Sequence, residues 1–255
     1  MGNVMKLQVP LFLPNYDKNK EYGYKGKKGE NLLDLLYETS KGYCMYCYSK
    51  IKVDSKRFGH LEHAVEKKYC KEILEECVPN IGLACPKCNQ SFKKAGDDKV
   101  KLSEKQIAKL QSCNCMKEKC QEACKEYEQL KQAYIKQRSI ILQPTGVKNG
   151  KKEYRIQYNL YSLKFEPSSL VAYSHDECEF IKEHIAQFKL NDSEYRTKEI
   201  LRFCDDILNG DKSLRKGKYN NMVVDLLIDQ FENMEYKDIV QLCEMIHTIV
   251  KMKKI

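Results

Sequence analysis

Two Cys-x-x-Cys pairs constrain the fold of this chain more than any other feature of its sequence. The first pair is Cys44 and Cys47, and the second is Cys85 and Cys88. Each pair offers two thiolates to one ion, and four thiolates arranged in this way satisfy the tetrahedral coordination of a structural zinc ion. We therefore expect the two pairs to meet around one Zn²⁺ ion.

Polar residues with metal-binding and proton-accepting side chains lie close to these pairs. Glu62 and His63 are adjacent, Asn80 precedes the second pair, and Asn89 follows it directly. The reference pKa of histidine is about 6.5, so His63 can accept a proton near neutral pH. The oxygen atoms of Glu62 and Asn89 suit Mg²⁺ or Mn²⁺. A zinc module without a catalytic role would explain the cysteines but not these residues, so the set indicates a metal-dependent nuclease.

The residues around this set alternate between strand and helix patterns. RFGHLEH (57–63) is typical of a strand, and VEKKYCKEILEECVPN (65–80) of a charged amphipathic helical insertion. IGLAC (81–85) is typical of a short buried strand, and PKCNQSFKK (86–94) opens a helix. The expected order is strand, connection, strand and helix.

An acid-histidine pair, a later asparagine that opens an apolar run, and a CxxCN motif followed by lysine resemble the zinc-framed HNH endonucleases. Their core is a ββα-metal unit, and the resemblance covers roughly a quarter of the chain. It implies that His63 is the base that activates water and that Asn80 orients it. It also implies that Glu62 and Asn89 hold a catalytic Mg²⁺ or Mn²⁺ ion.

This chain departs from the family pattern at two positions. Glu66 stands where many relatives have proline, and Phe92 stands where the family lysine is usual, with Lys93 and Lys94 just beyond it. Both departures concern how a DNA phosphate is gripped. Lys93, Lys94 and His60 are therefore further candidates for the site.

Composition indicates the partner and the compartment. The formal net charge is +9, mostly from lysine, which suits a polyanion such as DNA through phosphate neutralisation; a solvated lysine-rich surface would give the same charge. The N-terminus lacks a signal-peptide pattern, and no apolar run is long enough to span a membrane. We expect a soluble cytoplasmic protein, in which cysteine pairs more often bind metal than form disulfides.

The other cysteines give weaker signals. Four of them lie close together in the sequence: Cys113, Cys115, Cys120 and Cys124. They could form a second metal site, or their side chains could simply be buried in the packing of a helix. The remaining cysteines lie among helical apolar residues and are expected in the core: Cys70, Cys77, Cys178, Cys204 and Cys243.

The expected fold class is α+β and mostly helical, with a ββα-metal core, two zinc knuckles and a helical C-terminal region. The expected parts are an N-terminal arm (1–29), the HNH domain (30–112), a connecting region (113–175) and the helical region (176–255). Helices are expected at 30–39, within 103–137, and at 177–190, 193–210, 219–234 and 237–254, with a tight turn at 148–151 and a strand within 153–165. Ser103 and Gln106 are compatible with a capping box.

A looser resemblance concerns HIAQFKLNDSEYRTKEI (184–200). Together with the HNH motif, it is similar to the nuclease subunits of Septu and retron-associated anti-phage systems. That resemblance implies an ABC-type ATPase partner. This chain has no Walker A loop, so we do not expect it to hydrolyse ATP itself. The C-terminal helices would be a docking surface, or would only complete the fold. Two alternatives stay open: a zinc-stabilised DNA- or protein-binding module with a degenerate HNH site, and a self-sufficient restriction or mobile-element nuclease.

Overall fold

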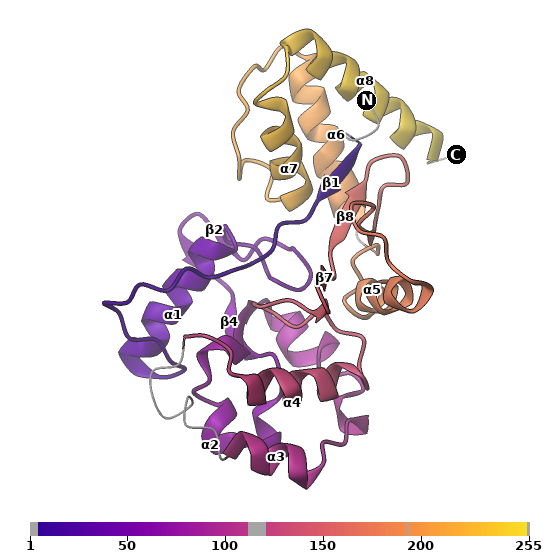
Figure 1. Cartoon of the computed structure of the whole chain (residues 1–255). Coiled ribbons are helices and arrows are strands. Elements are labelled where there is room, and N and C mark those ends of the chain that lie inside the picture. The colour runs from indigo at the N-terminus through magenta and orange to yellow at the C-terminus, as the bar shows by residue number, and fades with distance from the viewer. Residues whose placement is uncertain (1–4, 112–120, 193, 254–255) are drawn as a thin grey trace. The chain divides into compact units, whose positions relative to one another are not determined.

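The protein has a mixed α+β fold with small antiparallel sheets, in agreement with the expected class (Figure 1). The computed structural model describes residues 5–111, 121–192 and 194–253. Within these ranges, no helix combines the length and the apolar character needed to cross a bilayer.

The chain forms two compact units, which we name the cysteine unit and the terminal unit. The cysteine unit consists of Leu11–Cys47 and Ile51–Tyr154. The terminal unit consists of Met1–Pro10, Tyr48–Lys50 and Arg155–Ile255. These units cut across the four ranges expected from the sequence, because the first residues join a sheet with a strand from the second half of the chain.

The cysteine unit begins with α1 (Gly26–Thr39), which buries Leu32, Leu36 and Tyr37 on one face. The spacing of these residues is that of an amphipathic helix. Next come the two short strands β2 (Lys52–Val53) and β3 (Lys56–Arg57), which pair as a hairpin.

The central element of this unit is a second hairpin, in which β4 (His60–His63) pairs with β5 (Ile81–Ala84). His63 lies opposite Ile81 at one end of the pairing. Gly59 precedes β4 and donates its backbone N–H to the Tyr37 hydroxyl at 2.6 Å. A Cβ atom at Gly59 would lie 2.6 Å from Ile51 Cδ1, so a side chain at this position would displace its neighbours. Both expected strands are present.

The connection between β4 and β5 differs from the expected amphipathic helix. It consists of three short segments: the 3₁₀ turn η1 (Lys67–Tyr69), α2 (Lys71–Leu74) and the 3₁₀ turn η2 (Val78–Asn80). In a continuous helix the N–H of residue 79 would bond to the carbonyl of Glu75. Residue 79 is proline and has no N–H, so the helix ends and the Glu75 carbonyl is left for another donor.

The rest of the described cysteine unit contains two short helical turns, two α-helices and a small hairpin. Its elements are the π-type turn η3 (Cys88–Phe92), the 3₁₀ turn η4 (Asp97–Lys99), α3 (Glu104–Gln111), α4 (Lys125–Ile135), β6 (Lys148–Asn149) and β7 (Lys152–Glu153). Two helices, α3 and α4, lie side by side in place of the long helical stretch expected from 103 to 137 (Figure 1). The capping box is confirmed, since Ser103 N–H donates to Gln106 Oε1 at 2.8 Å and Gln106 N–H donates to Ser103 Oγ at 3.3 Å. The turn between β6 and β7 is also confirmed.

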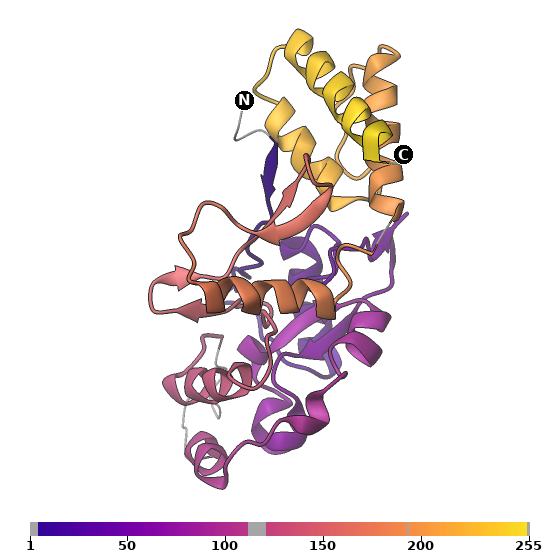
Figure 2. The same cartoon turned by 90° about the vertical axis from the view of Figure 1, so that its right-hand side faces the viewer.

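The terminal unit joins a three-stranded sheet to four helices. The sheet order is β1 (Lys6–Gln8), β8 (Ile156–Asn159) and β9 (Lys164–Pro167). The helices are α5 (His175–Gln187), α6 (Glu194–Leu208), α7 (Met222–Phe231) and α8 (Tyr236–Lys253). The long helices α6 and α8 pack against each other (Figure 2). The four expected C-terminal helices are therefore present.

Several side chains between 184 and 200 lie in the core of the terminal unit. His184, Phe188 and Leu190 are buried. The Arg196 guanidinium donates to the Leu190 carbonyl at 2.6 Å. These contacts close the turn between α5 and α6, so these side chains complete the fold.

Candidate functional site

The two cysteine pairs meet in the cysteine unit. The sulfur atoms of Cys44, Cys47, Cys85 and Cys88 all lie within 4.8 Å of one another. The first pair follows α1, and the second begins directly after β5. Three of the four side chains are buried, and Cys85 is half-buried. The fold therefore forms the four-cysteine cluster that the spacing predicts.

Backbone donors point at the sulfur atoms of this cluster. Cys85 N–H donates to Cys44 Sγ at 3.3 Å, and Cys88 N–H donates to Cys85 Sγ at 3.4 Å. Such donors stabilise thiolates and orient metal ligands. Burial raises the pKa of the Cys44 thiol, and the neighbouring cysteine thiols raise that of Cys88. A divalent cation would compensate four crowded thiolates, so the donor set fits a structural zinc ion.

His63 is held at the end of β4 by contacts on two sides. Its Nε2 atom lies 3.1 Å from the Glu75 carbonyl oxygen, and its ring centroid lies 4.5 Å from that of Tyr24. The Glu75 carbonyl is the one that Pro79 leaves without a helical partner. Because a carbonyl only accepts, this contact places the proton on Nε2, and the lone pair of a neutral ring then lies on Nδ1. Burial is the main cause that lowers the pKa of His63, which favours the neutral ring.

Asn80 anchors the chain that follows His63. Its Oδ1 accepts from Val65 N–H at 2.7 Å, and its Nδ2 donates to the Val65 carbonyl at 2.9 Å. Nδ2 also lies 3.3 Å from the Leu74 carbonyl, and the Tyr127 hydroxyl donates to Oδ1 at 2.9 Å. The side chain is fully buried. Asn80 thereby ties together three segments beside His63.

Glu62 lies in a buried ion pair. Its Oε1 is 2.7 Å from Lys93 Nζ, and its Oε2 accepts from the Tyr46 hydroxyl at 2.7 Å. The same ammonium lies 2.6 Å from Glu66 Oε1. The side chains of Lys93 and Glu62 are only 1% and 2% exposed. Burial opposes the charge on Lys93, but the two carboxylates outweigh it and raise its pKa.

Among the described residues, the structure gives no evidence of a catalytic Mg²⁺ or Mn²⁺ ion at Glu62 and Asn89. Both oxygens of Glu62 already have partners, one of them a cation. Asn89 is half-buried in the π-type turn η3. In the described parts of the chain, only the four cysteines bring together three or more donor atoms from His, Cys, Asp or Glu. Ion binding at Glu62 would require Lys93 to move away.

The other candidate residues lie at the edge of this arrangement. His60 is exposed at the start of β4, opposite Ala84, and Lys94 is exposed next to the buried Lys93. Sequence reasoning missed Tyr46 and Tyr127, which bind Glu62 and Asn80. The only sequence signal for Tyr46 is its position between Cys44 and Cys47.

The remaining cysteines are buried, half-buried or outside the described residues. Cys113, Cys115 and Cys120 lie outside the described residues. Cys124 caps α4, since its sulfur accepts from Tyr127 N–H at 3.3 Å. Of the five cysteines expected in the core, four are buried: Cys70, Cys77, Cys204 and Cys243. The fifth, Cys178, is half-buried.

Comparisons with protein-family models, with curated proteins and with solved structures found no match to this chain. The assignment of a function therefore rests on the residues and geometry of the site.

Proposed function

We propose that this protein is a zinc-framed HNH-type endonuclease that hydrolyses DNA phosphodiester bonds. The observation that carries the proposal is the placement of His63 at the end of the β4–β5 hairpin, with Nε2 directed at the Glu75 carbonyl. The four-cysteine cluster is built from segments adjoining the same hairpin. The hairpin is followed by the π-type turn η3, at the place where a ββα unit has its helix.

In this proposal His63 is the general base. Nδ1 would accept the proton of a water molecule as that water attacks the phosphorus atom. A positioned base of this kind contributes about 10²–10⁴-fold to a rate. Asn80 orients the base indirectly, because it fixes the backbone at Val65, two residues beyond His63.

The proposed reaction also requires a Mg²⁺ or Mn²⁺ ion bound by Glu62 and Asn89. The bound ion would stabilise negative charge on the phosphate. Its binding requires Lys93 to leave Glu62, since the two are 2.7 Å apart. The same ion pair favours a second candidate function, a zinc-stabilised DNA- or protein-binding module whose HNH site is degenerate.

Plasmid cleavage by the zinc-loaded protein tests the proposal, with Mg²⁺ or Mn²⁺ titrated into the reaction. The variants are His63→Ala and, as a matched control, His175→Ala, which removes an exposed histidine from the terminal unit. We expect metal-dependent cleavage by wild type and the control, and none by His63→Ala with unchanged zinc content. Equal cleavage by both variants would remove His63 from the mechanism. DNA binding without cleavage by the wild type, at every metal concentration, would favour the binding module.

We further propose a role as the effector of a bacterial anti-phage complex with an ABC-type ATPase. Its support is the resemblance over residues 184–200 together with the HNH motif. Because His184, Phe188 and Leu190 are buried, an ATPase would contact other residues of the terminal helices. Co-purification of an ATPase with the tagged protein from its native host tests this role. A protein that cleaves DNA fully without a partner would instead fit a self-sufficient restriction or mobile-element nuclease.

A further inference from the structure

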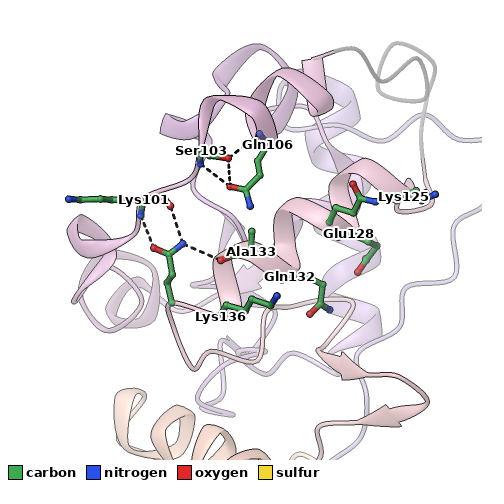
Figure 3. Close-up of a pocket in the computed structure, with 10 residues that line it drawn as sticks. Lys101, Ser103, Gln106, Lys125, Glu128, Gln132, Ala133 and Lys136 are labelled. Carbon is green, nitrogen blue, oxygen red and sulfur yellow. Dashed lines mark hydrogen bonds between the residues drawn. The ribbon is translucent and has the colours of Figure 1, made fainter.

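A polar groove lies between α3 and α4 in the cysteine unit, away from the candidate catalytic residues in sequence. Its main hollow has a volume of about 690 Å³ and adjoins a smaller one of about 330 Å³. Figure 3 shows Lys125, Gln132 and Lys136 along α4, and Ser103 and Gln106 at the start of α3. These side chains carry positive charges and amide groups, the donors that commonly bind phosphate oxygens.

The two faces of α4 have different roles. Lys125, Gln129, Gln132 and Lys136 recur at helical spacing and line the groove. The opposite face is buried and carries the two tyrosines that bind Asn80 and Asp97: Tyr127 and Tyr134. The helix is therefore anchored through its inner face to the segment beside His63, while its outer face forms one wall of the groove.

Lysine dominates the charge of this groove. The two hollows are lined by five lysines and two glutamates: Lys101, Lys105, Lys109, Lys125, Lys136, Glu126 and Glu128. Glu128 also lies 3.7 Å from the buried Lys131 ammonium, which offsets its charge. In the part of the chain that the structure describes, Lys105, Lys125 and Lys136 make no ion pair. The groove thus presents a positive surplus to solvent.

The length of the groove suits a nucleic-acid strand. From Lys125 to Lys136 the helix rises by about 16 Å, at about 1.5 Å per residue. A DNA strand advances by about 3.4 Å per nucleotide along the duplex axis, so this wall spans about five nucleotides. Amide side chains between the lysines add hydrogen-bond donors without base specificity.

We propose that the α3–α4 groove binds the sugar-phosphate backbone of DNA. This inference deepens the proposed function, on which it rests, because it assigns the surface that would hold the strand to be cut. Binding to the groove is nevertheless measured without cleavage, so the two proposals can fail separately.

The test is fluorescence anisotropy with labelled duplex DNA in the zinc-loaded His63→Ala background. The groove variant carries Lys105→Gln, Lys125→Gln and Lys136→Gln. The control removes the same charge from three exposed lysines of the terminal unit: Lys164→Gln, Lys237→Gln and Lys251→Gln. Circular dichroism establishes that both variants are folded, and an RNA duplex of the same sequence is the competing ligand.

We expect the groove variant to bind DNA at least about 100-fold more weakly at 0.1 M salt. A plot of log K against log salt concentration should be shallower by about 2–3, because each phosphate contact contributes about 0.9 to the slope. The control should change both quantities far less. Equal losses in the two variants would mean that only net charge matters, and that result overturns the groove assignment. No DNA binding by the parent, unchanged binding by the groove variant, or preference for RNA would also overturn it.

If the groove variant loses DNA binding while the protein with an intact His63 never cleaves, alone or with a co-purified ATPase, the groove assignment stands and the nuclease proposal fails. If cleavage depends on His63 but the groove lysines do not affect DNA binding, the nuclease proposal stands and the groove assignment fails.

Discussion

Replacing Lys93 with methionine tests the buried ion pair that distinguishes this site. The change keeps the apolar stem but removes an ammonium that lies 2.7 Å from Glu62 and 2.6 Å from Glu66. Glu62 is 2% exposed, so water cannot replace the lost partner, and only the Tyr46 hydroxyl still donates to the carboxylate among the contacts described here. Breaking one side of a buried pair costs about 3–5 kcal/mol. The free energy of unfolding of a domain is about 5–15 kcal/mol, so this loss is a large part of it.

Urea unfolding followed by circular dichroism or tyrosine fluorescence measures this loss, since the chain contains no tryptophan. With a slope of about 1–3 kcal/mol per molar urea, the unfolding midpoint of the cysteine unit should fall by about 2 M. Adding Glu62→Gln to the Lys93→Met variant replaces the uncompensated charge by a neutral amide. This double variant should recover at least half of the lost free energy of unfolding. A loss below about 1 kcal/mol in Lys93→Met, or no recovery in the double variant, would refute the assignment of a charged buried pair.

Three further predictions concern the zinc cluster, the asparagine clamp and a buried histidine. Cys47→Ser should lose zinc, as measured by mass spectrometry, and its melting temperature should fall by about 10 °C or more, because structural zinc contributes folding free energy. The control Cys178→Ser should keep its zinc and its melting temperature. Equal zinc content in the two variants would contradict the site. Asn80→Ala should lower the free energy of unfolding, measured in urea, by about 3 kcal/mol, because it leaves buried backbone groups without partners. The control is Asn89→Ala, at a half-buried position, and a similar loss in this control would count against the reasoning. Burial lowers the pKa of His184 to about 3, so the unfolded state binds more protons than the folded state between about pH 3 and 6.5, and stability falls as pH falls through this range. From pH 7 to 5 the terminal unit should lose about 2 kcal/mol, and His184→Leu should abolish that part of the loss; an unchanged pH slope would contradict it.

Local sequence patterns predict a large part of the fold. The four C-terminal helices, the capping box at Ser103 and the turn after β6 depend on contacts within a few residues, which the sequence displays directly. The strands β4 and β5 are predicted by their residue pattern, although their pairing joins segments on either side of the 64–80 connection. The helix expected between β4 and β5 is wrong for an equally local reason. Pro79 removes one N–H at the end of its ladder, and the backbone also leaves the helical conformation at Cys70, before α2 begins. The charge pattern along the connection nevertheless remains that of a helix.

In the candidate site, the sequence predicts the cysteine cluster but not the partners of Glu62. The cysteine spacing predicts the four-sulfur cluster, because a CxxC turn brings two sulfurs together before any tertiary structure forms. The partners of Glu62 cannot be predicted by spacing. Lys93 was a candidate for gripping phosphate, yet packing places its ammonium between two carboxylates. Whether Glu62 and Asn89 hold an ion stays a prediction.

By itself, the sequence determined the clustered cysteines, the acid-histidine pair and the helical character of the C-terminal half. The tertiary structure alone decided which groups surround His63, Asn80 and Glu62. The contact between Tyr127 and Asn80 joins residues 47 positions apart. Such a contact depends on how buried surfaces close over one another, because desolvation leaves each polar group only the partners that packing brings within reach.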